Sequence, residues 1–589
     1  MCGICGELRF DTTPVQPQTL DKMLKVLAPR GPDDAGQWIN NSVGFGHQRL
    51  AIIDLSKYGH QPMYDAELGL TLVFNGTIYN YPQLRKELIQ KGYSFFSHSD
   101  TEVILKAYHA WGEQCVSRLQ GMFAFAIWDG QRLFIARDRF GIKPLYYAQT
   151  THGFRFASTL PALLAAGDVD KSIDPVGLHH QFTLHAVVPA PYTILKGIRK
   201  VPPAHFITIT PEGKVNTQCY WQLSAQRPQQ ALNDTQWIEA THEALKAAVD
   251  SHRTIADVPV GVLLSGGLDS SLLVGLLAEN TDVENLLTFS IGFDDVAGEK
   301  GSEFEYSDQV VARYHTRHHK LQIPNNRVLS RLPEAIHNMS EPMVGQDAVA
   351  FYLLAEQVSK QVKVVQSGQG ADEVFAGYFW YSMMNDAAGT HLQRFAPYYF
   401  DRSHEEFLQT VMPEYHGEDY TSLLVNDLLS AKGADEFLDS VLRMDVTTLI
   451  VDDPVKRVDN MTMAWGLEAR VPFLDHQLVE LAAQIPPELK LRESGKHLLK
   501  AIARDLLPAS VIDRPKGYFP MPALKYVRGE FLHFMQEVLN STACRQRGLF
   551  QRDYVNKLLA QPEQYMTKLN GSKLWHLTLL EAWLQEHVD

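Results

Sequence analysis

The sequence predicts a two-domain protein that joins an α+β domain, residues 1–222, to an α/β domain with a helical C-terminal part, residues 236–589. Three observations support this prediction. A chain of 589 residues is too long for a single hydrophobic core. Its first part contains short apolar runs separated by turn signals, which are typical of antiparallel sheets. Its second part alternates strand-like and helix-like segments, which is typical of a parallel sheet covered by helices.

In the first domain, two dipeptides that favour turns lie next to the apolar runs. Asp129-Gly130 separates two of these runs and is a hairpin signal, and Asn75-Gly76 follows a third, from which we expect another turn. The predicted elements are strands at 72–74, 123–128 and 133–136 and helices at 81–90 and 101–111.

A polar stretch at 222–236 predicts a linker between the domains. Beyond it, β and α segments alternate, and this order favours a doubly wound parallel sheet. From about residue 380 onward the pattern is mainly helical. The predicted elements before that point are helices at 236–251 and 270–279 and strands at 259–264, 286–291, 320–323 and 363–366.

The composition narrows the class of protein. Hydrophobic residues make up 45% of the chain and charged residues 21%, and the net charge is −14, which disfavours nucleic acid and anionic membranes as partners. No uninterrupted apolar run is long enough for a membrane span, and no signal peptide is recognisable. Five scattered cysteines are too few for a disulfide framework, so we expect a cytoplasmic protein.

Met1-Cys2-Gly3 is the first chemical signal. Removal of Met1 would make Cys2 the N-terminus, with a thiol and a free α-amine on one residue. An α-amine has a pKa of roughly 7.7–8.0, so near neutral pH it can take the thiol proton directly or through water. Cys2 is therefore a candidate nucleophile that needs no histidine. Its spacing from Cys5 is that of half a zinc site, but no second ligand pair follows.

The second signal is the sequence Ser265-Gly-Gly-Leu-Asp-Ser270, where an apolar strand turns into a helix. Glycines let backbone amides approach an anion, and a helix N-terminus favours negative charge. Asp269 is suited to hold Mg²⁺ against a phosphate. The loop lacks the lysine of a P-loop and is not a dinucleotide fingerprint. A generic glycine turn is the alternative.

A second strand end repeats this theme at Ser367-Gly-Gln-Gly-Ala-Asp372. The carboxyl ends of parallel strands share one edge of a sheet, where ligands bind. We therefore expect Asp269 and Asp372 to flank one pyrophosphate and its Mg²⁺. The strand that ends near Ile291 reaches the same edge and is suited to contact adenine through its backbone.

With these motifs in order, nearly the whole chain resembles the asparagine synthetase family of glutamine-dependent amidotransferases. The resemblance implies an N-terminal-nucleophile hydrolase fold, an αββα sandwich, for the glutaminase domain. It implies an ATP-pyrophosphatase fold for the synthetase domain. It also implies glutamine, ATP, Mg²⁺ and a carboxylate acceptor as substrates and cofactors, and it leaves a homodimer open.

The resemblance assigns roles in the first domain by position. Cys2 matches the nucleophile, Asn75 and Gly76 match the oxyanion hole, Arg49 matches the residue that holds the glutamine α-carboxylate, and Asp100 matches the acid that recognises its α-amine. The implied glutamine-binding residues are Arg49, Leu50, Ile53, Asn75, Gly76, Thr77 and Asp100.

In the second domain, Lys496 matches a lysine that stabilises the transition state of adenylation. Asp269 and Asp372 match the Mg²⁺ ligands, and residues 514–522 resemble a basic loop near that site. The implied ATP-binding residues are Leu263, Ser265, Gly266, Gly267, Asp269, Ser270, Ile291, Ser367 and Gly368.

The chain departs from asparagine synthetases at Gln369, at Thr159, where many relatives carry glutamate, and in the unusual segment 452–457. Asparagine synthetases carry glutamate where this chain has Gln369, at a position tied to forming the aspartyl adenylate. Loss of that negative charge favours an acceptor without a free amine, and the chain resembles the N-acetylglutaminylglutamine amidotransferase branch. Asparagine synthetase acting on aspartate is the alternative. A β-lactam-synthetase-like ligase would lack Cys2, and an inactive paralogue would have lost Cys2, Arg49, Asp269 or Lys496.

Overall fold

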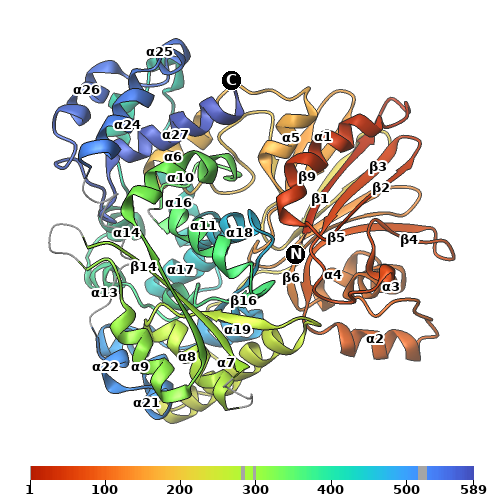
Figure 1. Cartoon of the computed structure of the whole chain (residues 1–589), viewed down its shortest axis with the longest axis horizontal. Coiled ribbons are helices and arrows are strands. Elements are labelled where there is room, and N and C mark those ends of the chain that lie inside the picture. The colour runs from red at the N-terminus through yellow and green to blue at the C-terminus, as the bar shows by residue number, and fades with distance from the viewer. Residues whose placement is uncertain (1, 280–284, 296–299, 346, 515–526) are drawn as a thin grey trace.

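The computed structural model describes residues 2–279, 285–295, 300–345, 347–514 and 527–589. Strands in these ranges form three sheets: two antiparallel ones in the first part of the chain and a parallel one in the second (Figure 1). The antiparallel sheets lie at one side of the molecule, and the C-terminal helices α24 to α27 lie at the opposite upper corner of the view. No helix among the described residues is both long enough and apolar enough to cross a membrane.

The first part is a four-layer sandwich. One sheet consists, in spatial order, of β10 (Arg199–Lys200), β8 (Tyr146–Gln149), β9 (Gly153–Ala157), β1 (Cys2–Arg9), β3 (Val43–Arg49) and β2 (Asp34–Asn40). The other consists of β12 (Val215–Cys219), β11 (His205–Ile209), β7 (Leu133–Arg137), β6 (Gly121–Trp128), β5 (Leu70–Ile78) and β4 (Met63–Asp65). The helices are α1 (Pro17–Leu27), α2 (Tyr81–Gln90), α3 (Asp100–Trp111), α4 (Cys115–Arg118), α5 (Leu160–Ala166) and α6 (Pro175–Thr183).

Hydrophobic alternation along the strands explains these layers. Ile4 and Phe45 of the first sheet pack with Val73 and Ala126 of the second, so the inner faces of the two sheets share one core. The outer faces pack on helices, with α1 and α5 against the first sheet and α3 against the second. This is the αββα sandwich of N-terminal-nucleophile hydrolases.

The predicted turn at Asn75-Gly76 is wrong, because β5 continues through both residues to Ile78. They pair with Ala124 and Phe123 of β6. A Cβ atom on Gly76 would lie 2.1 Å from the Met122 carbonyl oxygen. The glycine therefore serves a close approach of two strands rather than a turn.

The second part is built on a parallel sheet, in the order β15 (Arg317–Ile323), β14 (Leu287–Phe293), β13 (Val260–Leu263), β16 (Val364–Gln366) and β17 (Glu468–Arg470). α7 (Asp234–Thr254) precedes its first strand in the chain. The helices that follow are α8 (Leu268–Ala278), α9 (Phe304–Tyr314), α10 (Asn325–His337), α11 (Asp347–Val358) and α12 (Ala371–Val374). The sequence predicted four of the five strands; β17, with only three residues, was missed.

Beyond residue 378 the described chain is mainly helical, as predicted. The helices are α13 (Phe379–Asp386), α14 (His391–Tyr399), α15 (His404–Thr410), α16 (Tyr420–Ser430), α17 (Phe437–Met444), α18 (Lys456–Met463), α19 (His476–Ala483), α20 (Pro487–Leu491), α21 (His497–Leu506), α22 (Ala509–Ile512), α24 (Gly529–Asn540), α25 (Thr542–Arg547), α26 (Arg552–Ala560) and α27 (Lys573–His587). Two π-helical turns at 445–449 and 451–455 join α17 to α18.

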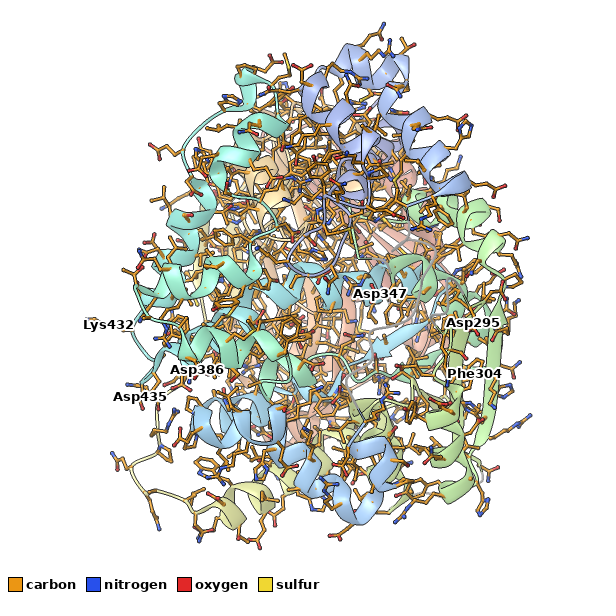
Figure 2. The ribbon with its side chains drawn as sticks, turned by 90° about the vertical axis from the view of Figure 1, so that its left-hand side faces the viewer. Asp295, Phe304, Asp347, Asp386, Lys432 and Asp435 are labelled. Atoms are coloured by element: carbon orange, nitrogen blue, oxygen red, sulfur yellow. The ribbon has the colours of Figure 1, made fainter. Side chains whose placement is uncertain are left out.

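The polar segment after residue 222 is held against the helical part. The N–H of Ala225 donates to the carbonyl of Gly433 at 2.7 Å, and the N–H of Arg227 donates to Asp435 at 2.7 Å. Figure 2 shows Lys432 and Asp435 at the outer rim of the molecule. The segment therefore runs over the surface as a strap with fixed contacts.

Buried ion pairs connect the two parts. Lys200 Nζ lies 2.8 Å from Asp452 and 3.1 Å from Glu341. Asp459 is 2.9 Å from Arg30 and 3.2 Å from Lys143. All of these side chains are almost fully buried, so the interface between the two parts is shielded from solvent at these ion pairs.

Candidate active sites

The first cavity lies at the end of the first sheet. Cys2 opens β1 and pairs in the sheet with Arg49, the last residue of β3. The cavity has a volume of about 30 Å³, and seven of the residues predicted from the sequence line it: Cys2, Arg49, Leu50, Ile53, Gly76, Thr77 and Asp100. Residues from β1, β3, β5 and α3 thus meet at one point.

Asn75, the remaining predicted residue, lies beside this cavity rather than in its lining. Its Oδ1 accepts a hydrogen bond from the N–H of Cys2 at 2.9 Å. Its Nδ2 is buried and has no hydrogen-bond partner among the described residues. A buried donor without a partner is costly, unless a ligand oxygen completes it.

Arg49 is fixed by backbone carbonyl groups. Its guanidinium donates to the carbonyls of Ser56 at 3.2 Å and Ile53 at 3.4 Å, and also to that of Asp54. The side chain is buried and lines the cavity. Its position is therefore set before a ligand arrives, which suits recognition of a carboxylate.

Burial perturbs the ionisable groups of this cavity. It raises the pKa of the Cys2 thiol, although a hydrogen bond from the backbone of Leu50 and the charge of Arg49 oppose the shift. Burial also raises the pKa of Asp100 to about 6. Asp100 is therefore close to a change of charge in the range where enzymes work, whereas the Cys2 thiol is kept protonated and needs a base to become a nucleophile.

The second part of the chain also contacts the wall of this cavity, and this contact was not predicted from the sequence. Thr77 Oγ1 donates to Glu468 of β17 at 3.3 Å, and Arg470 Nε donates to the same carboxylate at 2.5 Å. The side chains of Glu468 and Arg470 are both fully buried. The segment 464–475 reads as a family signature in the sequence, but nothing local indicates that it touches the first domain.

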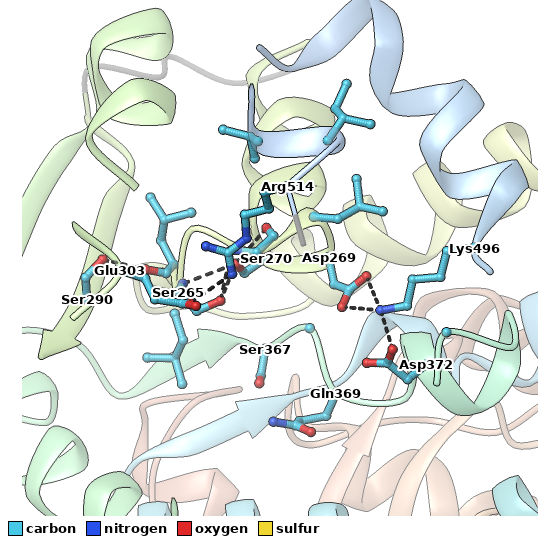
Figure 3. A pocket seen from close by; sticks show the side chains of 18 of the residues that line it. Ser265, Asp269, Ser270, Ser290, Glu303, Ser367, Gln369, Asp372, Lys496 and Arg514 are labelled. Carbon is cyan, nitrogen blue, oxygen red and sulfur yellow. Dashed lines mark hydrogen bonds and ion pairs between the residues drawn. The ribbon is translucent and has the colours of Figure 1, made fainter. Parts of the chain in front are cut away.

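The second cavity, of about 530 Å³, lies at the carboxyl edge of the parallel sheet. Figure 3 shows the loops after β13 and β16 on either side of it, with Ser265, Asp269 and Asp372 pointing inward. Its lining includes these predicted residues: Leu263, Ser265, Gly267, Asp269, Ser270, Ile291, Ser367, Gly368, Gln369, Asp372 and Lys496.

Gly266 is the one predicted ATP-binding residue outside the lining. It has φ +81°, and a Cβ atom there would lie 2.7 Å from the backbone nitrogen of Ser307 in α9. Its role in the structure is to let the loop pass close to a helix. Around it, Ser265 Oγ and Ser270 Oγ are 3.0 Å apart, and the N–H of Gly267 donates to Ser265 Oγ at 3.2 Å.

Lys496 lies between the two predicted metal ligands. Its Nζ is 2.7 Å from Asp269 and 2.8 Å from Asp372. Burial lowers its pKa, but the two carboxylates outweigh burial, and the pKa is raised above its usual value. The ammonium group thus holds the carboxylates of two strand ends together (Figure 3).

Several lining residues were not predicted as ligand-binding. Glu303 forms an ion pair of 2.9 Å with Arg514, and Phe351 and Lys500 complete the wall. Arg514 is the first residue of the basic loop expected at 514–522; the rest of that loop lies outside the described residues. Glu303 and Phe351 lie in no motif, so only the fold brings them to the site.

Comparison with known proteins decides the family. A family described as asparagine synthase matches residues 240–585, and one described as a glutamine amidotransferase domain matches residues 1–221. The chain belongs to the asparagine synthase family. Members of this family with an amidotransferase domain are ligases that form carbon–nitrogen bonds with glutamine as the nitrogen donor, and this holds for the present chain.

Asparagine synthase relatives match over nearly the whole length. The chain is 33% identical to asparagine synthetase [glutamine-hydrolyzing] 3 of Bacillus subtilis (strain 168), over 88% of this chain and 87% of that one. It is 31% identical to asparagine synthetase [glutamine-hydrolyzing] 1 of the same organism, over 100% and 97%. It is also 28% identical to amidase chry2 of Gibberella zeae, over 88% and 86%.

Proposed function

We propose that this chain hydrolyses glutamine in the first cavity, adenylates an acceptor carboxylate with ATP in the second, and amidates that carboxylate with the released ammonia. The observation that supports this most is the meeting of Cys2, Arg49 and Asp100, from three separate elements, at one cavity. Family membership alone does not supply this arrangement of side chains.

In the first half-reaction, removal of Met1, which lies outside the described residues, would free the α-amine of Cys2. The amine takes the thiol proton, and the sulfur attacks the side-chain amide carbon of glutamine. Asn75 Nδ2 and the N–H of Gly76 donate to the oxygen that becomes negative. Collapse releases ammonia and leaves a thioester, which water hydrolyses to glutamate.

Specificity for glutamine follows from two charges. Arg49, fixed by its carbonyl partners, binds the α-carboxylate, and ionised Asp100 binds the α-ammonium. Thr77, Leu50 and Ile53 supply the remaining wall of the cavity.

In the second half-reaction, the amides of the loop at 265–270 and the N-terminus of α8 bind the phosphates of ATP. Asp269 and Asp372 form a pair of oxygen ligands that fits Mg²⁺, which when bound would neutralise phosphate charge. Lys496 stabilises the negative charge on the oxygens of the reacting phosphoryl group as the acceptor carboxylate attacks and pyrophosphate leaves. Ammonia then displaces AMP from the acyl adenylate.

We propose N-acetylglutaminylglutamine as the acceptor, amidated at its terminal carboxylate. Gln369 lines the second cavity beyond Ser367, away from Lys496 (Figure 3). A neutral amide there offers no charge to an α-ammonium group, so it suits a blocked amine better than free aspartate. Amidation of aspartate is the alternative, and the names of the relatives in Bacillus subtilis favour it.

A panel of acceptors distinguishes the two. Purified enzyme with ATP, Mg²⁺ and glutamine is given aspartate or the acetylated dipeptide, and amide product, AMP and pyrophosphate are measured by mass spectrometry. We expect faster amidation of the dipeptide, and Gln369→Glu should shift the ratio toward aspartate. Faster amidation of aspartate by the unaltered enzyme would contradict the acceptor proposal.

Cys2→Ala tests the glutaminase half separately. We expect loss of glutamine-dependent synthesis while synthesis from added ammonium salt remains, because only the nitrogen source is affected. Cys219→Ser, which alters the one exposed thiol, is the matched control and should keep both activities. Retained glutamine hydrolysis in Cys2→Ala would contradict the mechanism.

A further inference from the structure

A buried cluster of three side chains lies away from both cavities. His185 follows α6, Asp401 lies between α14 and α15, and His576 lies in the first turn of α27. Nitrogen and oxygen atoms of the three side chains all lie within 4.8 Å of one another. Residues almost 400 positions apart in the chain are thus brought to one point.

The hydrogen-bonding capacity of this cluster is not satisfied. His185 Nδ1 lies 2.9 Å from Asp401 Oδ2, but Asp401 Oδ1 has no hydrogen-bond partner among the described residues. His576 is 1% exposed, and neither of its ring nitrogens has a partner there. Its Nδ1 lies 3.6 Å from Asp401 Oδ2, which is too long for a hydrogen bond.

Leaving three polar atoms buried and unpaired costs free energy. A bound cation reduces this cost, because it accepts one lone pair from each side chain. We propose that His185, Asp401 and His576 bind a divalent transition-metal ion of the Zn²⁺ class.

The donor set selects this class. Two imidazoles and one carboxylate suit Zn²⁺, whereas Mg²⁺ and Ca²⁺ prefer oxygen ligands alone. Bonds of about 2.0–2.2 Å to a tetrahedral ion place its donors roughly 3.4 Å apart. The separations of 2.9 and 3.6 Å in the cluster bracket that spacing.

The surrounding backbone already holds the three segments in place. The N–H of Asp401 donates to the carbonyl of Thr183 at 3.0 Å, and Arg402 donates to the carbonyl of Lys573 at 3.0 Å. Arg402 and Lys573 place positive charge near the ring of His576. Lys573 is paired with Glu406 at 2.6 Å, so the ion meets mainly the charges of Asp401 and Arg402.

A second histidine cluster serves as a comparison. His179, His404 and Asp419 also lie within 4.8 Å of one another. There, His179 Nδ1 lies 2.7 Å from Thr421 Oγ1, and its Nε2 lies 3.0 Å from His404 Nδ1. Both ring nitrogens are therefore already used within the protein, and we assign no ion to this cluster.

The proposed ion would fasten α27 to the segment after α6. That segment lies within the region matched by the amidotransferase family, and α27 ends the region matched by asparagine synthase. The role is therefore structural, and it is independent of the chemistry proposed for the two cavities.

Titration with Co²⁺, which gives intense visible absorption in tetrahedral sites, tests the proposal. The full chain is freed of metal with a chelator and kept in excess Mg²⁺, so that the carboxylates of the second cavity do not compete. We expect one equivalent of Co²⁺ for each chain, displaced by Zn²⁺. His185→Gln and Asp401→Asn should lose this spectrum, whereas His404→Gln and Cys219→Ser should keep it.

Thermal melting separates binding from folding. Zn²⁺ should raise the melting temperature of the unaltered chain, because it binds only the folded state. His576→Leu should melt at the same or a higher temperature than the metal-free chain, since an unsatisfied ring is removed, and it should no longer respond to Zn²⁺. Absence of a stoichiometric spectrum, or its retention in His185→Gln and Asp401→Asn, would overturn the proposal.

Discussion

In the proposed mechanism, glutamine recognition depends on the charge of one buried side chain, Asp100. Its carboxylate accepts a hydrogen bond from the N–H of Ile78 at 3.1 Å, and burial raises its pKa to about 6. Below that pH the carboxyl is neutral and cannot pair with the α-ammonium group of glutamine. Above it the negative charge is present, at a cost in desolvation that a bound ammonium group offsets.

The pH dependence of glutamine hydrolysis should therefore show two steps. Protonation of the α-amine of Cys2, with a pKa of roughly 7.7–8.0, gives a first decline in kcat/KM as pH falls. Protonation of Asp100 adds a second below pH about 6, so the slope steepens from about one to about two log units per pH unit. Steady-state glutamate release between pH 5 and 9 measures this profile.

Asp100→Asn is the control for this assignment. It should lower kcat/KM at neutral pH and keep only the first decline, because the amide does not titrate. If the steeper slope below pH 6 persists in the variant, another group is responsible.

Single residues were predictable from the sequence where a motif surrounds them. Cys2, Asn75 and Asp269 lie in such motifs, and the structure places them at or beside the two cavities. Glu303, just before α9, and His576, in α27, were not predictable, since no motif surrounds either residue and only folding brings distant partners to it. A sequence pattern shows how residues are spaced along the chain. These contacts join residues that are far apart in the chain and close together only in the folded structure.

At the scale of elements, strand β17 connects the two parts although it has only three residues. Arg470 Nη1 donates to the carbonyls of His252 at 2.7 Å and Ile255 at 2.9 Å, and its Nε holds Glu468. Glu468 in turn accepts from Thr77 of β5. β17 consists of Glu-Ala-Arg within the mainly helical part of the chain, so it has no apolar strand pattern and could not be predicted from the sequence.

Arg470→Met should destabilise the protein by about 3–5 kcal/mol, because it removes the cation that pairs with the buried carboxylate of Glu468. A lower melting temperature by calorimetry is the expected result. Arg118→Met removes a pair with Glu87 of similar length, 2.6 Å, that is exposed to solvent, and should change stability by no more than about 1 kcal/mol. Equal effects of the two substitutions would show that burial of the Arg470 pair is unimportant.

Element boundaries illustrate why prediction succeeded in part. Long periodic segments such as α7 were placed within a few residues, because tertiary packing and local pattern agree there. Asn75-Gly76 was misread, since the same dipeptide that favours a turn also permits a close approach of two strands. Tertiary contact with β6, which the local sequence does not contain, decided between them.

At the scale of the whole molecule, Lys200 links the two parts. It is 1% exposed and lies between Asp452 and Glu341. Lys200→Met should leave two buried carboxylates without this partner, lower stability by about 3–5 kcal/mol and loosen the interface. We also expect more glutamate to be released per amide formed, since ammonia escapes when the interface opens.

Calorimetry and product ratios measure both effects. Lys196→Met, which alters an exposed lysine four positions earlier, is the matched control and should leave both unchanged. A normal product ratio in a clearly destabilised Lys200→Met protein would show that the interface does not govern ammonia transfer.

The buried ion pairs also bear on how the two parts could exist as separate chains. The first part contributes only cations to them, Arg30, Lys143 and Lys200, and the second contributes the anions Glu341, Asp452 and Asp459. Made separately, the halves would present surfaces of opposite charge that attract each other across water and speed their assembly, most strongly at low ionic strength. The complementary charges at the interface would thus guide the two halves of a split enzyme to assemble in the correct orientation.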